Sequence, residues 1–426
     1  MVAMPEIAAP SASLRVRARA IPSDSPAFGP SLLDLLPADA DPCAWLGPRR
    51  AMVGTGRALA IPLVGADQIR DAGLVWERVR RSAVVEAEPG APAVPVALAS
   101  FAFSSQASSV VLVPELLIIE DEAGRWAVSA SAHGPAPDPL ALAERSADRA
   151  RTGAPRPPEG LTTGVGVMTQ TQWTDAVAQM SRRLRAGEAS KAVMTRDLPV
   201  HSPAPIDARY LLARLTDLYP QTWRFCVDRL IGATPEMLGA ASGGRLHSRV
   251  LAGTAAPGCG EALMGSDKDR REHELAVASV VDALAPLTED LEVPDRPFIL
   301  DLPNVSHLAS DVSASLEDVG LLDAIAALHP TAAVCGTPRA DALRLLRELE
   351  RTERGRYSGP VGWIDASDEG EFGLALRCGR LEDDGRTLRI FAGGGIMPDS
   401  DPLSELAETR AKMAPLLEAL GANVGR

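Results

Sequence analysis

The sequence contains few cysteines and no long apolar run. Its five cysteines lie far apart and form neither a C-x-x-C nor an H-x-x-x-H pattern, which argues against a disulfide framework and a structural zinc site. No apolar stretch reaches the roughly 18 residues of a membrane-spanning helix, and the N-terminus lacks the basic and apolar segments of a secretion signal. We therefore expect reduced thiols and a cytoplasmic protein that does not contact a membrane.

Positive charge is also scarce. Lys and Arg number 43 against 56 Asp and Glu, so the formal net charge is −13 at pH 7. This balance argues against nucleic acid as a partner, and an anionic ligand would need positive charge gathered locally. With 46% hydrophobic and 23% charged residues among 426, the composition is that of a folded globular protein.

Two nucleotide-binding motifs and internal repeats are absent as well. The glycine run at residues 393–396 has no following G-K-[ST] and no G-x-G-x-x-G spacing, so it is neither a P-loop nor a dinucleotide-binding fingerprint. No period of about 20 to 50 residues repeats, which argues against a solenoid or a propeller.

The hydrophobic pattern predicts a mixture of strands and helices. A segment rich in Pro, Gly and Ala at residues 134–160 is expected to be a surface connection within one architecture. Strands are predicted at 97–103, 110–120, 191–200, 224–231, 359–364, 373–380 and 388–392, and helices at 141–151, 173–184, 339–350, after Ser266 and after Ser400. Helices packed on antiparallel strands joined by hairpins make an α+β fold.

Two acidic helices are candidates for binding a cation. In the last helix, with Ser400 as its predicted cap, Glu405, Glu408 and Lys412 are expected to share one face. The helix after Ser266 carries Glu272, followed by a predicted apolar stripe at positions 275, 278, 281 and 284. Carboxylates from two helices are ligands that suit Mg²⁺. A solvated charged face explains the same spacing.

Nine motifs in a fixed order then identify a resemblance. The chain resembles the chorismate-utilising enzymes, most closely the isochorismate synthases, over about residues 165–420. The motifs are SKAVMTRDL, IGATPEML, VLAGTAAPG, SDKDRREHELAV, LPNVSHLASDV, LHPTAAVCGTPR, RGRYSGPVGWID, GEFGLALRCG and FAGGGIMPDSDPLSELAETRAK. The resemblance implies layered antiparallel sheets with helices outside, in which residues 1–160 form a variable part and residues 161–426 the chorismate-binding catalytic region.

The resemblance also implies roles for individual residues. Lys191 resembles the general base that activates water, and Glu236 the general acid. Glu272, Glu405 and Glu408 resemble the residues that hold Mg²⁺, the expected cofactor. The residues that resemble substrate-binding positions are Gly253, Thr254, His307, Ala333, Tyr357, Arg377, Gly393 and Lys412. Among these, Tyr357 and Arg377 would hold the enolpyruvyl carboxylate, and His307 would lie near the leaving hydroxyl.

The reaction explains why these residue types are needed. Exchanging the C4 hydroxyl of chorismate for one at C2 requires an activated water, help for a poor leaving group, and neutralisation of two carboxylates. A lysine and a glutamate have unperturbed pKa values of about 10.4 and 4.3. Base and acid roles at neutral pH therefore require a site that moves the two values towards each other.

Several related activities remain open. Family members that use ammonia usually carry Gln where Lys191 stands and pair with a glutaminase, so Lys191 favours water as the nucleophile and no glutaminase partner. Salicylate synthases share the lysine and also eliminate pyruvate; the CGTPR segment at residues 335–339 favours isochorismate as the product. A non-catalytic chorismate-binding paralogue is disfavoured by the retained Lys191, Glu236 and metal glutamates. We expect a monomer, whose product feeds menaquinone, siderophore or salicylate-derived pathways.

Overall fold

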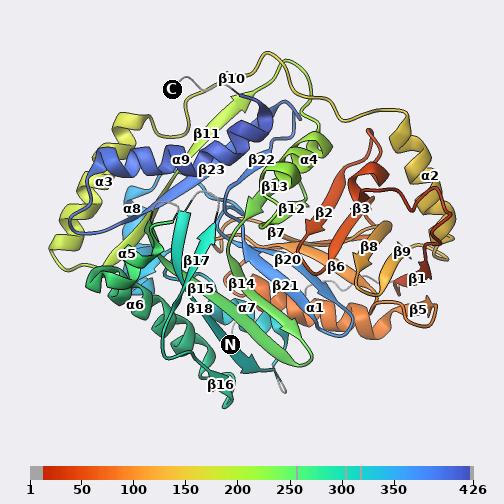
Figure 1. Ribbon diagram of the computed structural model, residues 1–426, viewed down its shortest axis with the longest axis horizontal. Helices are drawn as coiled ribbons and strands as arrows, with labels where there is room; N and C mark the ends of the chain where they lie inside the picture. Colours follow the sequence, from red (N-terminus) through yellow and green to blue (C-terminus); the bar gives the residue numbers. More distant parts are fainter. Residues whose placement is uncertain (1–12, 256–257, 303–304, 317–318, 423–426) are drawn as a thin grey trace.

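A computed structural model describes residues 13–255, 258–302, 305–316 and 319–422 (Figure 1). Within these residues, two large sheets carry helices on their outer sides: α2, α3, α4 and α9 lie along one side of the molecule, and α1, α6 and α7 along the other. All strand pairs are antiparallel except β1 with β5. The α+β prediction is thus confirmed.

The first sheet has 13 described strands. In spatial order it contains β10 (Thr162–Thr163), β11 (Lys191–His201), β23 (Thr387–Ile396), β22 (Cys378–Leu381), β13 (Leu230–Thr234), β12 (Trp223–Val227), β2 (Pro42–Leu46), β3 (Ala51–Thr55), β8 (Leu116–Asp121), β9 (Gly124–Ser131), β1 (Arg15–Ala20) and β5 (Val84–Ala87), with β19 (Gly336–Thr337) beside β11.

The second sheet has ten described strands. Their order is β16 (Leu291–Glu292), β18 (Val305–Ser315), β15 (Arg245–Ala255), β14 (Met237–Ser242), β21 (Gly370–Leu374), β20 (Pro360–Asp365), β6 (Val96–Ser100), β7 (Ser109–Val113) and β4 (Leu59–Leu63), with β17 (Phe298–Leu302) beside β18.

The described helices are α1 (Gln68–Ser82), α2 (Pro139–Arg151), α3 (Gln170–Arg185), α4 (Ala208–Leu218), α5 (Gly260–Gly265), α6 (Asp267–Leu284), α7 (Leu321–Leu328), α8 (Arg339–Leu349) and α9 (Pro402–Leu420), with a short 3-10 helix, η1 (Leu32–Leu35). None of them is long and apolar enough to cross a membrane.

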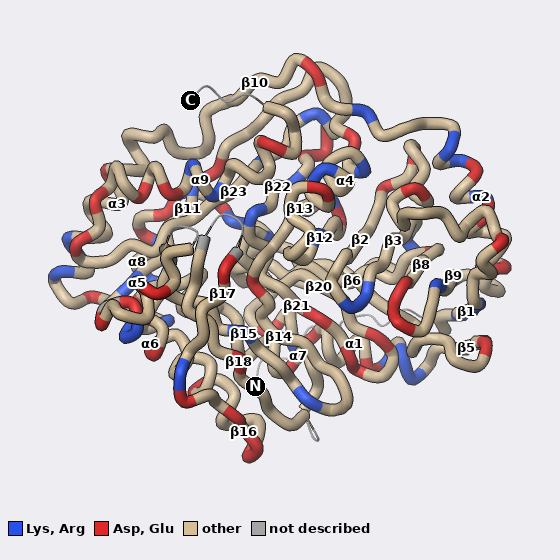
Figure 2. The backbone as a smooth tube through the Cα atoms, in the orientation of Figure 1, with Lys and Arg blue, Asp and Glu red and all other residues tan. Residues whose placement is uncertain are grey.

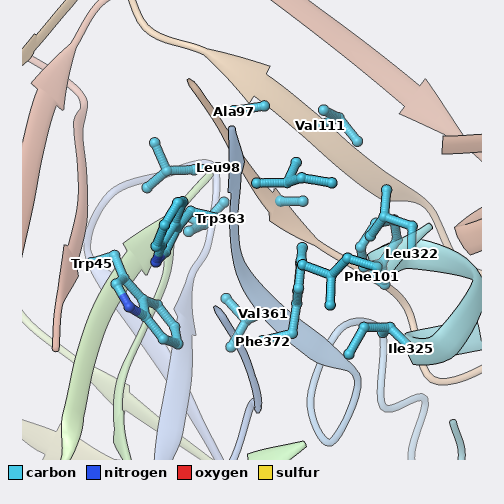
Figure 3. Close-up of a cluster of buried hydrophobic side chains, with 14 of the residues drawn as sticks. Trp45, Ala97, Leu98, Phe101, Val111, Leu322, Ile325, Val361, Trp363 and Phe372 are labelled. Atoms are coloured by element: carbon cyan, nitrogen blue, oxygen red, sulfur yellow. The ribbon is translucent and has the colours of Figure 1, made fainter. Parts of the chain in front are cut away.

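The largest core joins the two sheets. Trp45 of β2 in the first sheet belongs to the same buried cluster as Phe372 of β21 and Val361 of β20 in the second (Figure 3). Leu322 and Ile325 of α7 belong to the same cluster. Strands from the first 160 residues contribute to both sheets, while the boundary at residue 160 stays a prediction.

Helix α3 illustrates how local sequence signals produce an element. Thr169 caps it, its hydroxyl accepting from the Gln172 amide, and the Gln172 side chain accepts from the Thr169 amide in return. Trp173, Val177 and Met180 follow at helical spacing and are fully buried against the first sheet. The predicted helix and its buried face are therefore confirmed.

Some predicted strands are instead pairs of strands. Residues 110–120 form β7 and β8, and residues 373–380 form β21 and β22; in both cases the two strands belong to different sheets. Residues 224–231 contain a hairpin turn at Asp228 and Arg229, both with positive φ. When an apolar segment passes from one sheet to the other, its hydrophobicity does not change, because both sheets bury its side chains.

The predicted apolar stripe of α6 is only partly confirmed, because Leu284 is buried in the core as expected but the start of the stripe is not. Leu275 is 51% exposed, whereas His273 and Val280 are buried and Ala276 is partly buried against the core. The buried face of α6 is thus rotated from the predicted one, and it includes a histidine that hydrophobic periodicity does not detect.

Candidate active site

Lys191 stands at the first residue of β11, where the strand faces the glycines of β23. Val193 pairs with Gly395 and Thr195 with Gly393. A Cβ added to Gly395 would lie 2.8 Å from Cε of Lys191, so the lysine side chain runs directly over this glycine. The strand pairing and the missing side chain together place the Lys191 amine above the glycine strand.

Helix α6 presents Glu272 to this lysine. Ser266 caps the helix, its hydroxyl accepting from the Asp269 amide. Nζ of Lys191 donates to Oε1 of Glu272 at 2.8 Å. The adjacent His273 is buried and its Nε2 lies 2.8 Å from Oγ of Ser310 in β18. This contact fixes the turn of α6 that carries Glu272.

Glu236 lies where the chain passes from β13 in the first sheet to β14 in the second. Its amide donates to Oγ1 of Thr234 at 3.2 Å, which fixes the turn. Burial raises the pKa of Glu236 to about 7, although the positive charges of Lys412, Lys191 and Arg377 oppose that shift. A large share of this carboxyl is therefore protonated near neutral pH, as a general acid requires. Glu236 and Ala333 also line one pocket.

Arg377 lies in the crossover between β21 and β22, with a positive φ of 49°. Burial lowers its pKa, opposed by Tyr357, Tyr219, Glu408 and Glu236. Within the described part of the chain, no hydrogen bond or ion pair joins its guanidinium to another residue. A non-glycine residue in the left-handed region and a half-buried guanidinium without a fixed partner among the described residues both point to an anion-binding role.

Tyr357, Gly393 and Lys412 meet on the β23 strand. The ring of Tyr357 is buried and stacks on Phe391 with centroids 5.3 Å apart. A Cβ at Gly393 would lie 3.5 Å from the Tyr357 hydroxyl. Nζ of Lys412 donates to the Gly393 carbonyl at 2.9 Å and pairs with Glu408 at 2.6 Å. Burial raises the pKa of Tyr357, so its hydroxyl stays a neutral donor.

Gly253 and His307 form a contact in the second sheet. Gly253 has a φ of +76° at an irregularity in β15, which favours glycine. Nδ1 of His307 donates to the Gly253 carbonyl at 3.1 Å. Burial lowers the pKa of His307, and the Arg377 and Lys412 charges add to this effect. The Thr254 backbone pairs with His307, while the Thr254 side chain lies outside the described part of the structure.

The three predicted metal ligands have different partners. Glu272 pairs with Lys191 and Glu408 with Lys412, while Oε1 of Glu405 accepts from the Ser400 hydroxyl at 2.6 Å. Asp401, not Ser400, caps α9, because Ser400 is engaged with Glu405 and its own loop. Among the described residues no three acidic, histidine or cysteine side chains form a ready metal-binding group.

Glu405 nevertheless retains a free ligand atom. Its Oε2 is buried and has no hydrogen-bond partner among the described residues, and a Cβ at Gly394 would lie 2.8 Å from it. Burial raises the pKa of Glu405, and the neighbouring Glu408 raises it further. An unpartnered buried carboxylate oxygen beside a second carboxylate fits a divalent cation. The Mg²⁺ assignment to Glu272, Glu405 and Glu408 stays a prediction.

Charged residues are spread over the molecule, whereas lysine is concentrated at the site. Acidic and basic residues are interspersed over the whole molecule (Figure 2), so the negative net charge is not gathered in one place. The chain has only three lysines, Lys191, Lys268 and Lys412, and two of them lie here. In an arginine-rich chain, a lysine at these positions indicates a need for a compact ammonium that can exchange its proton. The scarcity of lysine is thus a sequence signal for these two residues that does not depend on the motifs.

Known proteins include several that are similar to this chain. Isochorismate synthase MenF of Bacillus subtilis is 33% identical over 267 residues, covering 60% of this chain and 56% of that protein, so the match spans about half of this relative's length. The salicylate biosynthesis isochorismate synthase of Pseudomonas aeruginosa is 33% identical over 413 residues, covering 89% of this chain and 85% of that protein.

A solved structure and a family model extend the comparison. The structure of MenF, the menaquinone-specific isochorismate synthase from Escherichia coli, has the same fold, with a TM-score of 0.78 at 24% identity over 96% of this chain and 95% of that one. The sequence model described as chorismate binding enzyme matches residues 45–421. With nearly the whole chain matched, this protein belongs to the chorismate-binding enzyme family.

Proposed function

We propose that this protein is an isochorismate synthase, which converts chorismate to isochorismate by adding water at C2 with loss of the C4 hydroxyl. The relatives compared above carry this activity in their names. The single observation that supports it best is the position of Glu236. It is a carboxyl with a pKa raised to about 7 by burial, within the electrostatic reach of Lys191.

The chain's own residues would divide the reaction as follows. Arg377 holds the enolpyruvyl carboxylate, helped by the Tyr357 hydroxyl, and the glycines of β23 let the ring approach the backbone. Lys191 takes the proton of the water whose oxygen bonds to C2. The ring double bonds shift, the C4–O bond breaks, and Glu236 gives its proton to the departing hydroxyl, which leaves as water.

Lys191 must release Glu272 and lose one proton before it acts as a base. In the structure its ammonium is held at 2.8 Å from that carboxylate. Glu272, Glu405 and Glu408 would hold Mg²⁺. Such an ion would supply positive charge to neutralise the ring carboxylate. Lys412, which the structure pairs with Glu408, would add a further positive charge for the substrate.

The enzyme would act as a single chain. Water as nucleophile needs no glutaminase subunit, and Lys191 stands where ammonia-using relatives usually carry Gln. We also propose a cytoplasmic monomer whose product feeds menaquinone, siderophore or salicylate synthesis.

Product analysis tests the activity. The purified protein is incubated with chorismate and Mg²⁺, without ammonia or glutamine, and the products are resolved by chromatography and mass spectrometry. We expect isochorismate, lost when EDTA is present. Salicylate with pyruvate would assign the protein to salicylate synthases instead, and turnover only with added ammonia would contradict the role of Lys191.

A further inference from the structure

Among the described strands, none pairs with the outer edge of β11 where it passes the active site. On its inner side the strand pairs with β23 from Ala192 to His201. On its outer side β19 pairs with the first two residues and β10 with the last two. Between them, the Val193 amide donates to the Cys335 carbonyl at 2.9 Å, while the Val193 carbonyl and the Thr195 amide face an edge without a described strand.

Two charged side chains replace the missing strand. Nη2 of Arg354 donates to the Val193 carbonyl at 2.5 Å. Oε2 of Glu350 accepts from the Thr195 amide at 2.8 Å. The two side chains also bind each other, with Nε to Oε1 at 2.6 Å and Nη2 to Oε2 at 2.8 Å. They thus provide the donor and the acceptor that a neighbouring strand would provide.

This ion pair is deeply buried. The side chain of Arg354 is 3% exposed and that of Glu350 is 6% exposed. Buried pairs of this kind add little stability over apolar residues of the same size, because both charges must be removed from water. A pair retained at this cost, with each partner bonded to the backbone of β11, indicates a need for defined geometry.

Arg354 contacts two other walls of the site, one through its guanidinium and one through its backbone. Its Nη1 donates to the carbonyl of Val334, next to Ala333, at 2.7 Å. The Arg354 carbonyl accepts from the Tyr357 amide at 2.9 Å. One side chain and its own backbone therefore connect the strand that begins with Lys191, the loop that carries Ala333 and the turn that carries Tyr357.

We propose that Arg354, held by Glu350, is a positioning residue that fixes Lys191, Ala333 and Tyr357 relative to one another during chorismate turnover. This inference rests on the proposed function. Arg354 acts through the backbone and does not itself contact the substrate. Misplacing a catalytic group by about 1 Å can cost about 10²-fold in rate, so a defect here should appear in kcat.

The test compares two arginines of the same segment. Arg356 is also buried and also bonds to backbone, donating to the Asp228 carbonyl at 2.6 Å, but it supports the β12–β13 turn and not β11. Arg354→Lys should lower kcat by about 10-fold or more while KM for chorismate changes by less than about 3-fold. Arg356→Lys should lower Tm and keep kcat within about 2-fold. Unchanged kcat in Arg354→Lys, or equal losses in both variants, would overturn the proposal.

Two further measurements cover the remaining cases. If Arg354→Lys does not fold, Glu350→Gln takes its place, because it keeps the size of the side chain and one oxygen for the Thr195 amide; unchanged kcat there would overturn the proposal. If the wild type makes no isochorismate, the proposed function fails, and hydrogen exchange at the Thr195 amide decides the positioning role alone. We expect faster exchange in the Arg354 or Glu350 variant than in Arg356→Lys, and equal exchange would contradict it.

Discussion

The position of Glu236 in the fold changes the acidity of its carboxyl group. Its pKa is raised to about 7 by burial. The protonated form is the acid, so kcat/KM should fall as pH rises through about 7, by up to tenfold per pH unit once the group is ionised. Glu236→Gln should lower kcat/KM by about 10²-fold and remove this alkaline limb. A pH–rate profile of both proteins checks this, and a limb that persists in the variant would assign the acid role elsewhere.

The residues differ in how far the sequence could predict them. The motifs identify Lys191, Glu236 and Arg377, and the structure brings the charges of Lys191 and Arg377 within electrostatic reach of Glu236. The pKa of Glu236 could not be predicted, because burial depends on the turn between the two sheets. Arg354 belongs to the RGRYSGPVGWID motif, but its pairing could not be predicted, since a sequence does not show which charged side chains are buried as a pair.

At the scale of the element, the glycines of β23 leave room for the site because they have no side chains. Among the described residues, a Cβ at Gly395 would meet only the end of the flexible Lys191 side chain, with Cε at 2.8 Å and Nζ at 3.5 Å. Gly395→Ala should therefore keep the fold but displace the lysine, lowering kcat by about 10-fold or more. Gly29→Ala is a matched control, because nothing lies within 4 Å of the added Cβ.

Steady-state kinetics and thermal unfolding separate the two effects. We expect Tm within a few degrees of wild type in both variants and a loss of kcat in Gly395→Ala alone. Wild-type kcat in Gly395→Ala would show that Lys191 is not held over this strand during turnover.

Helix α9 contributes carboxylates whose role depends on Mg²⁺. Glu408→Gln should raise the Mg²⁺ concentration for half-maximal turnover by about 10-fold or more, because a neutral amide is a weaker ligand for a hard cation. Glu418→Gln on the same helix is the control, since Glu418 instead accepts from the Tyr219 hydroxyl at 2.9 Å. Calorimetric titration with Mg²⁺ gives a second readout, and equal Mg²⁺ dependence in the two variants would place the metal elsewhere.

Elements with local signals were predictable, and elements defined by the sheets were not. The capping pair of Thr169 and Gln172 and the spacing of Trp173 and Val177 define α3 without tertiary information. By contrast, the apolar run at residues 373–380 changes sheet within a few residues, and only tertiary pairing shows it. That crossover holds Arg377, so the error in the strand prediction fell on a site residue.

At the scale of the whole molecule, the site lies where the chain crosses from one sheet to the other. Glu236 lies in one crossover between the sheets and Arg377 in another, while Lys191 and Gly393 belong to the first sheet and His307 to the second. Strands from the first part of the chain complete both sheets, although that part showed no motif. Its contribution follows from strand pairing, which a single sequence does not specify.

Turnover in water labelled with oxygen-18 tests the central claim most directly. If Lys191 activates water for attack at C2 while Glu236 assists loss of the C4 hydroxyl, isochorismate formed from unlabelled chorismate should carry one heavy oxygen at C2. Mass spectrometry of the product and its fragments locates the label. Isochorismate without heavy oxygen would mean that the hydroxyl moves within the substrate, and it would contradict the roles assigned to both residues.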